Sequence, residues 1–265
     1  MSFSIEGKTA IVTGAANGIG LAIGRHFANQ GANVMFVDMD DERLEREVGN
    51  SEDDNVRWFA GDLRERLTIA NLLSATLDSF DKVDILVNAS RQVVWTDPLE
   101  DEDDSVNLML QQNLMAPLAL SRLVAQRMIR QGKDQEDGAL GAIINLSSVA
   151  ARRTRPELLG YSIATAALDQ MTRSLAVALA PHRIRVNSVA IGSLMSASLK
   201  SVLKENDGYR KVIEDNTPMS RIAGPGEMVE AVQYLASDAS KFMTGQILTV
   251  DGGRTLLDPV PAPAH

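Results

Sequence analysis

The stretch Thr9–Gly20, T-A-I-V-T-G-A-A-N-G-I-G, decides how the chain is expected to fold. Its first five residues, Thr9–Thr13, are apolar or β-branched and lead into a glycine turn, which is typical of a buried parallel strand. Gly14, Gly18 and Gly20 then stand where a strand must turn sharply into a helix and where a side chain would keep a phosphate from the backbone. The spacing G-x-x-x-G-x-G also fits a tight loop between two packed elements, so it does not decide the function by itself.

The acidic residue after the next predicted strand strengthens a nucleotide interpretation. A helix over Ile19–Asn29 would offer free backbone amides and a positive dipole end to a pyrophosphate. Asn33–Val37 reads as a strand that ends in Asp38, 18 residues after Gly20, close to the ~20 expected for an acid that binds an adenosine ribose. A carboxylate there would repel a 2′-phosphate, so NAD is predicted over NADP. An ordinary loop or cap role for Asp38 is the alternative.

Length and composition bound the classes of protein that fit. The chain has 265 residues, and we expect one domain over residues 1–257 and an extended or disordered tail over 258–265. The net charge of −9 disfavours nucleic acid and anionic membranes as partners. The absence of cysteine excludes disulfides and thiolate chemistry. The three histidines, His26, His182 and His265, lack metal-ligand spacing, so no metal site is predicted.

The N-terminus and the hydropathy of the chain indicate where it would work. The opening M-S-F-S-I-E-G-K has neither the basic start nor the long apolar core of a signal peptide. No apolar run approaches the ~20 residues that cross a bilayer. A cytoplasmic location is therefore expected.

Strand and helix patterns alternate along the whole chain. This alternation predicts an α/β fold, a Rossmann-type doubly wound parallel sheet of about seven strands with helices on both faces. Gly192–Thr217 has weak periodicity just past a strand and is expected to form a mobile lid. The further predicted strands are Val56–Ala60, Val83–Val87, Ala142–Leu146, Ile184–Val189 and Gln246–Val250, and the further helices are Asp41–Val48, Arg64–Phe80, Val106–Ile129, Tyr161–Leu179 and Glu227–Ala236.

Polar residues follow the third and fourth predicted strands at the rim where open α/β sheets collect ligands. Asp62 follows the third strand and could contact adenine or cap the next helix. Asn88, Ala89 and Ser90 follow the fourth strand. A shared ligand site along this rim is predicted.

Taken together, these motifs resemble the short-chain dehydrogenase/reductase family over nearly the whole chain. The matching segments are T-G-x-x-x-G-I-G at Thr13–Gly20, the acid at Asp62, N-A at Asn88–Ala89, I-N-L-S-S at Ile144–Ser148, Tyr161 thirteen residues later, and T-G-Q-x-L-x-V-D-G-G at Thr244–Gly253. The resemblance implies hydride transfer between a nicotinamide and an alcohol or carbonyl carbon. It implies cofactor contacts from Gly14, Asn17, Gly18, Ile19, Gly20, Asp38, Asp62, Leu63, Asn88, Ala89, Tyr161, Thr165, Gly192 and Ser196.

The same resemblance implies the catalytic roles. Tyr161 would give and take the proton, Ser148 would hydrogen-bond the substrate oxygen, and Asn113 would belong to a water-linked proton relay. Hydride leaves an alcohol only if its proton has somewhere to go, and a free tyrosine, with a pKa of about 10, is a poor base at neutral pH.

The chain departs from the family at the lysine four residues after the tyrosine, where Thr165 stands. An ammonium about 5 Å from a phenolate would favour its ionisation by roughly 3 kcal/mol at an effective dielectric near 20. Thr165 carries no charge, although it could still hydrogen-bond a ribose. Two further departures lie nearby, since Ser90 replaces the last glycine of N-A-G and Ile191 replaces the proline of P-G.

Two functions follow from these residues. The first is an NAD(H)-dependent oxidoreductase with an atypical proton path, acting on a small alcohol or carbonyl compound. The alternative is a catalytically impaired homologue that serves as an NAD-responsive binding or assembly subunit. A third idea is that Arg152, Arg153 or Arg155 replaces the lost charge or holds an anionic substrate. By analogy with the family, a homotetramer is expected.

Overall fold

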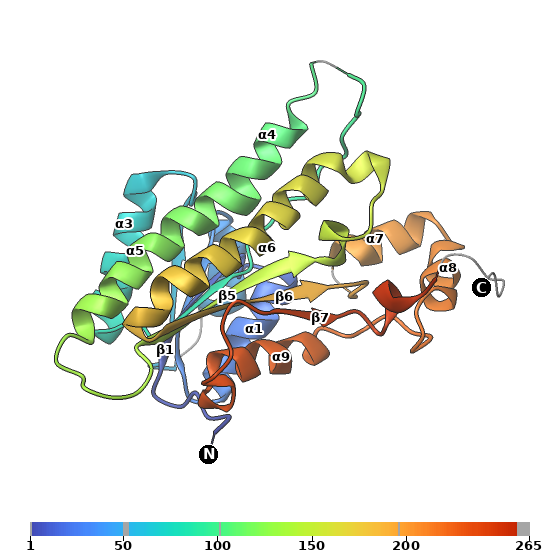
Figure 1. The fold of residues 1–265 in the computed structure, drawn as a ribbon. Helices are drawn as coiled ribbons and strands as arrows, with labels where there is room; N and C mark the ends of the chain where they lie inside the picture. Colours follow the sequence, from blue (N-terminus) through green and yellow to red (C-terminus); the bar gives the residue numbers. More distant parts are fainter. Residues whose placement is uncertain (1, 50–52, 101, 196, 259–265) are drawn as a thin grey trace.

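The computed structural model describes residues 2–49, 53–100, 102–195 and 197–258, and a seven-stranded parallel sheet forms its centre (Figure 1). The strand order is β3-β2-β1-β4-β5-β6-β7, which confirms the predicted doubly wound fold. The order reverses between β1 and β4, and ligands of such sheets bind outside the carboxyl ends of the strands at this point. The strands are β1 (Thr9–Thr13), β2 (Asn33–Asp38), β3 (Val56–Ala60), β4 (Ile85–Asn88), β5 (Gly141–Ser148), β6 (Ile184–Ile191) and β7 (Ile247–Val250).

Helices and short helical turns connect these strands. The α-helices are α1 (Gly18–Asn29), α2 (Asp41–Leu44), α3 (Arg66–Phe80), α4 (Ser105–Leu110), α5 (Ala116–Gln131), α6 (Leu159–Leu179), α7 (Ala197–Glu205), α8 (Tyr209–Asp215) and α9 (Gly226–Ala236). The π-helical turns are η1 (Glu45–Gly49) and η2 (Gln111–Met115), and the 3₁₀ turns are η3 (Val149–Ala151), η4 (Pro156–Leu158), η5 (Ala180–His182), η6 (Asp238–Ser240) and η7 (Arg254–Leu256).

Alternate side chains of each strand pack into two separate hydrophobic cores, one on each face of the sheet. In β1, Val12 packs with α1 and α9 on one face of the sheet, whereas Ile11 packs with α3 and α5 on the other. Successive side chains of a strand point to opposite faces, and both faces are covered here, so the strands are continuously apolar. Figure 1 shows the resulting layers.

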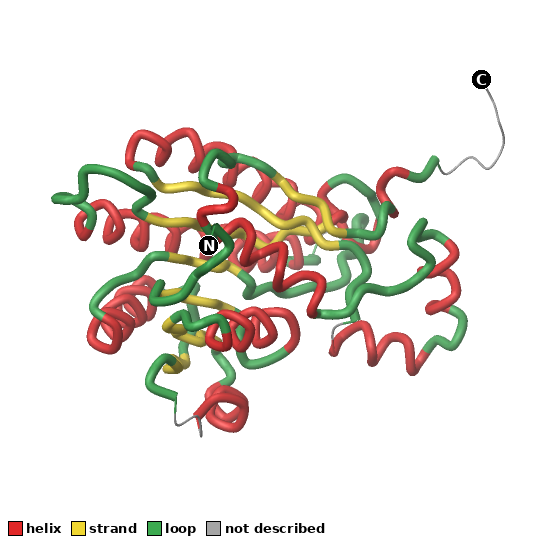
Figure 2. The backbone as a smooth tube through the Cα atoms, turned by 90° about the horizontal axis from the view of Figure 1, so that it is seen from below, coloured by secondary structure: helices red, strands yellow, loops and turns green. Residues whose placement is uncertain are grey.

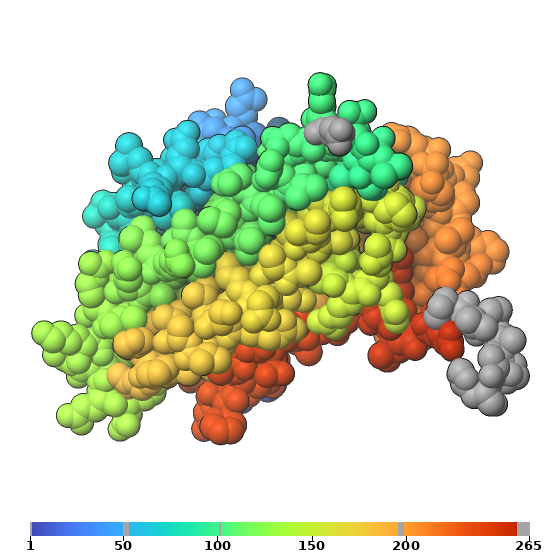
Figure 3. All heavy atoms as spheres, turned by 45° about the horizontal axis from the view of Figure 1, so that its top comes forward, coloured from blue at the N-terminus to red at the C-terminus, as the bar shows by residue number. Residues whose placement is uncertain are grey.

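The long helical rod from α4 to α5 is interrupted by the π turn η2. The sequence predicted one helix over Val106–Ile129, but the structure has α4, η2 and α5 in succession. A π turn inserts one extra residue and re-aims the side chains near it. The rod lies beside α6 across one face of the molecule (Figure 3).

Several predicted boundaries move at the carboxyl ends of strands. β5 extends through Ser147 and Ser148, which pair with Ala190 and Ile191 of β6. The apolar pattern missed these residues because serine is polar, although backbone pairing continues through them. The predicted helix Asp41–Val48 is α2 followed by η1.

The segment predicted as a lid contains α7 and α8. Both lie beyond the carboxyl ends of the strands (Figures 1 and 2). Its mobility stays a prediction, as does the assignment of residues 1–257 to one domain. Residues 259–265 of the predicted tail lie outside the described residues.

Two kinds of feature are absent from the residues that the structure describes. None of their helices combines the length and the apolar character needed to cross a membrane. Nor do three of their histidine or carboxylate side chains gather as a metal site would require.

Candidate active site

The turn after β1 is held in a conformation that only glycine adopts easily. Gly14 and Gly18 have positive φ angles of 64° and 55°. A Cβ on Gly20 would lie 2.2 Å from the Gly14 carbonyl oxygen, and one on Gly14 would lie 2.7 Å from Ser90 Cα. The turn is therefore packed tightly between α1 and the loop after β4.

The N-terminus of α1 opens at this turn without an internal cap. Asn17 is extended and its side chain makes no capping hydrogen bond, and the first turn contains no acidic residue. The first amides of a helix have no intrahelical partner. Because α1 is 12 residues long, these amides and the helix dipole suit an anionic ligand such as a pyrophosphate.

Asp38 closes the same turn from the end of β2. One carboxylate oxygen accepts a hydrogen bond from the Ala16 amide at 3.1 Å, and the other accepts from the Met39 and Asp40 amides at 2.8 and 3.2 Å. A carboxylate has about four lone-pair sites. The Asp38 carboxylate can therefore still accept a further hydrogen bond, such as one from a ribose hydroxyl.

A cavity of about 420 Å³ connects the loops after β1, β2, β3 and β4. Most of the predicted cofactor residues line it, namely Gly14, Asn17, Gly18, Ile19, Gly20, Asp38, Asp62, Leu63 and Ala89. Its other walls include residues that the sequence did not single out as contacts, namely Val37, Met39, Gly61, Arg64, Ser90, Arg91, Gln92, Leu108 and Gln112. The cavity thus joins the carboxyl ends of β1 to β4, whereas the predicted contacts Asn88, Tyr161, Thr165 and Gly192 are not among its lining residues.

Asp62 faces this cavity in an ion pair. Its carboxylate lies 2.6 Å from Arg64 Nη2, and this hydrogen-bonded guanidinium holds the pKa of Asp62 below its usual value. The residue before α3 is Glu65, so Asp62 does not occupy the N-cap position of that helix. A contact with adenine remains the prediction for Asp62.

Asn88 turns its side chain into the interior. Its amide nitrogen donates to Asn145 Oδ1 at 2.8 Å and to Ser121 Oγ at 3.0 Å. These bonds satisfy a buried polar group and tie β4 to β5 and α5. The Asn88 side chain therefore holds the carboxyl end of β4 in place through buried hydrogen bonds.

Ser148 and Tyr161 lie at the carboxyl end of β5 and the start of α6. Ser148 Oγ accepts a hydrogen bond from the Ala150 amide at 3.1 Å, which leaves its hydroxyl hydrogen to donate. The Tyr161 side chain is buried among Met109 and Ala164. Its hydroxyl accepts a hydrogen bond from Arg91 Nη1 at 3.3 Å.

Thr165 is directed into its own helix. Its hydroxyl lies 2.8 Å from the Tyr161 carbonyl oxygen and 3.2 Å from that of Ser162, and the residue is 2% exposed. Its hydrogen is thus donated to backbone one turn earlier, a common arrangement for threonine in helices. The geometry favours this structural use of Thr165 over a contact with a ribose.

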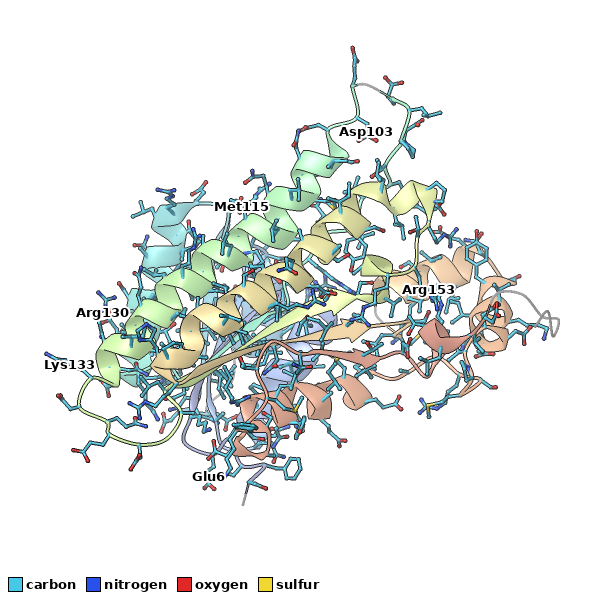
Figure 4. All side chains as sticks on the ribbon, viewed as in Figure 1. Glu6, Asp103, Met115, Arg130, Lys133 and Arg153 are labelled. Carbon is cyan, nitrogen blue, oxygen red and sulfur yellow. The ribbon has the colours of Figure 1, made fainter. Side chains whose placement is uncertain are left out.

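The arginines considered as replacements for the lysine have other partners. Arg152 donates to Thr249 Oγ1 at 2.9 Å and lies 3.9 Å from Asp169. Arg153, labelled in Figure 4, donates to the carbonyl of Thr255 in η7, and Arg155 pairs with Glu157. The cation that the structure brings to Tyr161 is instead Arg91.

Arg91 was not expected from the sequence, because only the segment between Ser148 and Tyr161 was considered as a source of charge. A signal was present, since Arg91 directly follows Asn88-Ala89-Ser90 at the predicted rim. Because β4 and β5 are neighbours in the sheet, the loop after β4 approaches the start of α6.

Asn113 lies in η2 and binds the loop that carries Arg91. Its Oδ1 accepts from the Gln92 amide and its Nδ2 donates to the Gln92 carbonyl, both at 2.8 Å. Both polar ends of the side chain are thus engaged. The side chain positions this loop, whereas a part in a proton relay stays a prediction.

The last two predicted contacts lie beyond β6. Gly192 packs at the end of β7, since its amide donates to the Val250 carbonyl at 3.1 Å and an added Cβ would lie 2.7 Å from Cβ of Asp251, the residue after the strand. Ser196 lies outside the described residues. A nicotinamide contact from either residue stays a prediction.

Comparisons with known proteins show the family of this chain. Residues 14–255 match a family model described as enoyl-(acyl carrier protein) reductase. The chain belongs to the short-chain dehydrogenase/reductase family. An uncharacterized oxidoreductase of Thermotoga maritima is 31% identical to it over 257 residues, covering 95% of this chain and 99% of that protein.

Solved structures of the family show the same fold with different cofactors. A gluconate 5-dehydrogenase from Burkholderia cenocepacia, in complex with NADP and tartrate, superposes with a TM-score of 0.87, 27% identity and coverage of 97% of this chain and 98% of that one. A 3-ketoacyl-(acyl-carrier-protein) reductase from Brucella melitensis, complexed with NADH, superposes with a TM-score of 0.85 and is 30% identical in sequence. The match covers 95% of this chain and 100% of that one. This chain is therefore a short-chain dehydrogenase/reductase oxidoreductase, and the likeness does not choose between NAD and NADP.

Proposed function

We propose that this protein transfers a hydride between NAD(H) and a small alcohol or carbonyl compound, with Tyr161 as the acid and base. The observation that carries the proposal is the buried Tyr161, whose hydroxyl meets a guanidinium from a loop lining the cavity. When bound, the nicotinamide supplies or accepts the hydride. The first amides of α1 would hold its pyrophosphate, and Asp38 would hold its adenosine ribose.

The preference for NAD rests on the charges at the end of β2. A 2′-phosphate would approach the Asp38 carboxylate, which is fixed by three backbone amides. Met39, which follows it and lines the cavity, is uncharged. Of the arginines that line the cavity, Arg64 is engaged by Asp62 and Arg91 donates to Tyr161. Like charges would therefore disfavour NADP.

The residues at the other end of the site handle the proton. Tyr161 Oη would protonate the substrate oxygen during reduction and take the proton back during oxidation. The free hydroxyl hydrogen of Ser148 would donate to the same oxygen and hold it in place. Because Thr165 carries no charge, the proton path differs from the one that the family resemblance implies.

A hydride-transfer screen with Tyr161→Phe tests this function. Wild-type protein with NAD(H) and a panel of alcohols and carbonyl compounds should show a substrate-dependent change in NADH absorbance. Tyr161→Phe should lose about 10²- to 10⁴-fold in rate, the usual contribution of general acid–base catalysis, while its NADH affinity stays. Tyr234→Phe is the matched control, since that tyrosine lies on α9 and contacts Met243. Wild-type protein that binds NADH but never changes its absorbance would overturn the proposal.

The alternative, an NAD-responsive binding or assembly subunit, is motivated by the missing lysine. The named relatives and structural neighbours are oxidoreductases, dehydrogenases and reductases, which does not favour it. It predicts that Tyr161→Phe leaves the cellular phenotype unchanged. A lost phenotype from that one change would remove the alternative.

Assembly and location stay predictions from the sequence. A homotetramer is supported by apolar residues on the outer surface of η2 and α6, where Met115, Ile163 and Val177 are 45%, 42% and 78% exposed. Such a face is suited to an interface between copies. Light scattering on Val177→Lys should show a smaller assembly than wild type. A cytoplasmic location is proposed on the sequence alone.

A further inference from the structure

The loop after β4 carries a guanidinium to the hydroxyl of Tyr161. Arg91 Nη1 donates a hydrogen bond to Tyr161 Oη over 3.3 Å, from a position 70 residues earlier in the chain. An arginine side chain keeps its positive charge throughout the pH range of folded proteins. A permanent cation therefore lies at the atom that must release and regain a proton.

The backbone just before Arg91 is anchored to two elements. The Ser90 amide donates to Thr13 Oγ1 at 3.0 Å, at the end of β1. Ser90 Oγ accepts a hydrogen bond from Gln112 Nε2, also at 3.0 Å. The Ser90 side chain, which departs from the family glycine, thus helps to hold the loop.

The backbone just after Arg91 is anchored as firmly. Asn113 binds both the amide and the carbonyl of Gln92. Gln112 and Asn113 are consecutive residues of η2, whose π turn directs both side chains at the loop. The backbone on both sides of Arg91 is thus fixed, which leaves only the exposed Arg91 side chain itself to be ordered in the contact with Tyr161.

Among the residues that the structure describes, no carboxylate is hydrogen-bonded to the Tyr161 hydroxyl. The acidic loop before α4 is held to Gly160 through Thr96, and its Asp103 carboxylate accepts hydrogen bonds from the Asp97 and Ser105 amides. In the described parts of the chain, α4, η2, η3 and β5 contain no titratable side chain.

The charged groups of the other elements packed on α6 contact other residues. Glu157 of η4 pairs with Arg155, and Arg185 of β6 donates to Ser240. On α6 itself Asp169 lies by Arg152, and Arg173 of α6 and His182 of η5 come later in the chain than Asp169.

The apolar packing of the Tyr161 ring makes a charge partner important. The ring lies in a cluster with Met109, Ala150 and Ala164. A phenolate in such surroundings loses hydration, which disfavours the charged form unless an opposite charge compensates. Arg91 provides that charge from outside α6.

We propose that Arg91 supplies the positive charge that the missing lysine would otherwise place beside Tyr161. This inference rests on the proposed function, because it assigns Arg91 a role in that proton transfer. Arg91 stabilises the phenolate by its charge and hydrogen bond, and it neither gives nor takes the proton. The charge thus comes from the β4 loop instead of one turn along α6.

A tyrosinate titration of the full chain without cofactor tests the inference directly. The ultraviolet absorbance of tyrosinate is followed against pH, and subtraction of the Tyr161→Phe curve isolates Tyr161. In Arg91→Met this component should move to higher pH, because the nearby opposite charge that favours the phenolate is lost. Arg91→Lys should return the curve most of the way to wild type. Coincident curves for wild type and Arg91→Met would overturn the inference.

Two controls keep the titration interpretable. Arg130→Met removes an exposed arginine at the far end of α5 (Figure 4) and should match wild type. Arg91→Gln, which keeps a polar side chain, should move the curve as Arg91→Met does, with an unchanged melting temperature. A displaced curve with Arg130→Met as well would assign the effect to overall charge and overturn the inference.

A kinetic experiment separates this inference from the proposed function. The pH profile of kcat should move upward in Arg91→Met, and the rate at neutral pH should fall about tenfold for every pH unit by which the profile moves. A raised KM with an unmoved pH profile would mean that Arg91 binds substrate and would overturn the inference. If the Tyr161 titration curve is displaced in Arg91→Met but no hydride transfer is found, the proposed function alone is overturned. If hydride transfer is found but the wild-type and Arg91→Met curves coincide, the role of Arg91 alone is overturned.

Discussion

The two ends of the candidate active site are built by different means. The turn end, Gly14–Gly20 with Asp38, consists of backbone geometry that neighbouring atoms enforce. The tyrosine end, Arg91 with Ser148, Tyr161 and Thr165, consists of side chains from three separate elements. Gly14 and Gly20 leave no room for a Cβ and so tolerate almost no substitution, whereas a charge can be delivered from another loop. The loss of one lysine is therefore weak evidence for the loss of chemistry.

The largest effect should follow from a side chain placed in the turn end. Gly20→Ala puts a Cβ 2.2 Å from the Gly14 carbonyl oxygen, so the turn must move. We expect NADH affinity to fall at least about 100-fold and unfolding free energy to fall by about 1–3 kcal/mol, as in other overpacked sites. Calorimetry and thermal melts measure both.

The matched control for this change is Gly226→Ala at the start of α9, where an added Cβ meets nothing within 4 Å. It should bind NADH as wild type does. If Gly20→Ala also kept wild-type affinity, the turn end would not be the cofactor site.

Asp38→Asn should change the choice of cofactor at the turn end. It removes the negative charge that faces a 2′-phosphate and keeps one carbonyl oxygen, which can accept either from the Ala16 amide or from the Met39 and Asp40 amides. The ratio of kcat/KM for NADPH to that for NADH should rise roughly tenfold or more, equivalent to about 1.4 kcal/mol. Asp41→Asn, on exposed α2, should leave the ratio unchanged. A wild-type preference for NADPH would contradict the NAD assignment.

Thr165→Lys probes whether the tyrosine end already has its cation. Since Arg91 occupies that role, the added lysine should raise kcat by less than about tenfold in wild type. In the Arg91→Met background the same change should recover more of the lost rate. Lysine in a site that is 2% exposed should also lower the melting temperature. A large gain in wild type would show that Tyr161 lacks an effective cation.

Asp169→Asn should have the smallest effect of these changes. It should alter the thermal stability of the protein through a buried carboxyl group of α6, the helix that carries Tyr161. Burial raises the pKa of Asp169, against smaller opposing effects of the Ser147 hydroxyl and then of the nearby arginines Arg152 and Arg173. A folded pKa above the unfolded one means that the stability contributed by this group is full at acid pH and lost as pH rises through the folded value. Asp169→Asn should therefore melt slightly higher than wild type at pH 7 and similarly at pH 4. Asp215→Asn, exposed on α8 beside Lys211, should show no such gain at pH 7.

Most of the fold could be predicted because its signals are local. The strand Thr9–Thr13 is observed with the predicted bounds, and Val56–Ala60 is too. The predicted strand ends were wrong where polar residues continue a strand. Ser147 and Ser148 belong to β5, although the apolar pattern stops before them. The π turn η2 was also missed, since an inserted residue hardly alters the apolar spacing of a long helix.

The sequence alone determined the parallel sheet, the glycine turn and the acid at Asp38, because each depends on residues close together in the chain. Only the tertiary structure decided which cation meets Tyr161. Arg91 lies 70 residues away from it in the chain, and the two meet because β4 and β5 are neighbours in the sheet. Such a contact depends on strand order and loop anchoring, which no local pattern around Tyr161 contains.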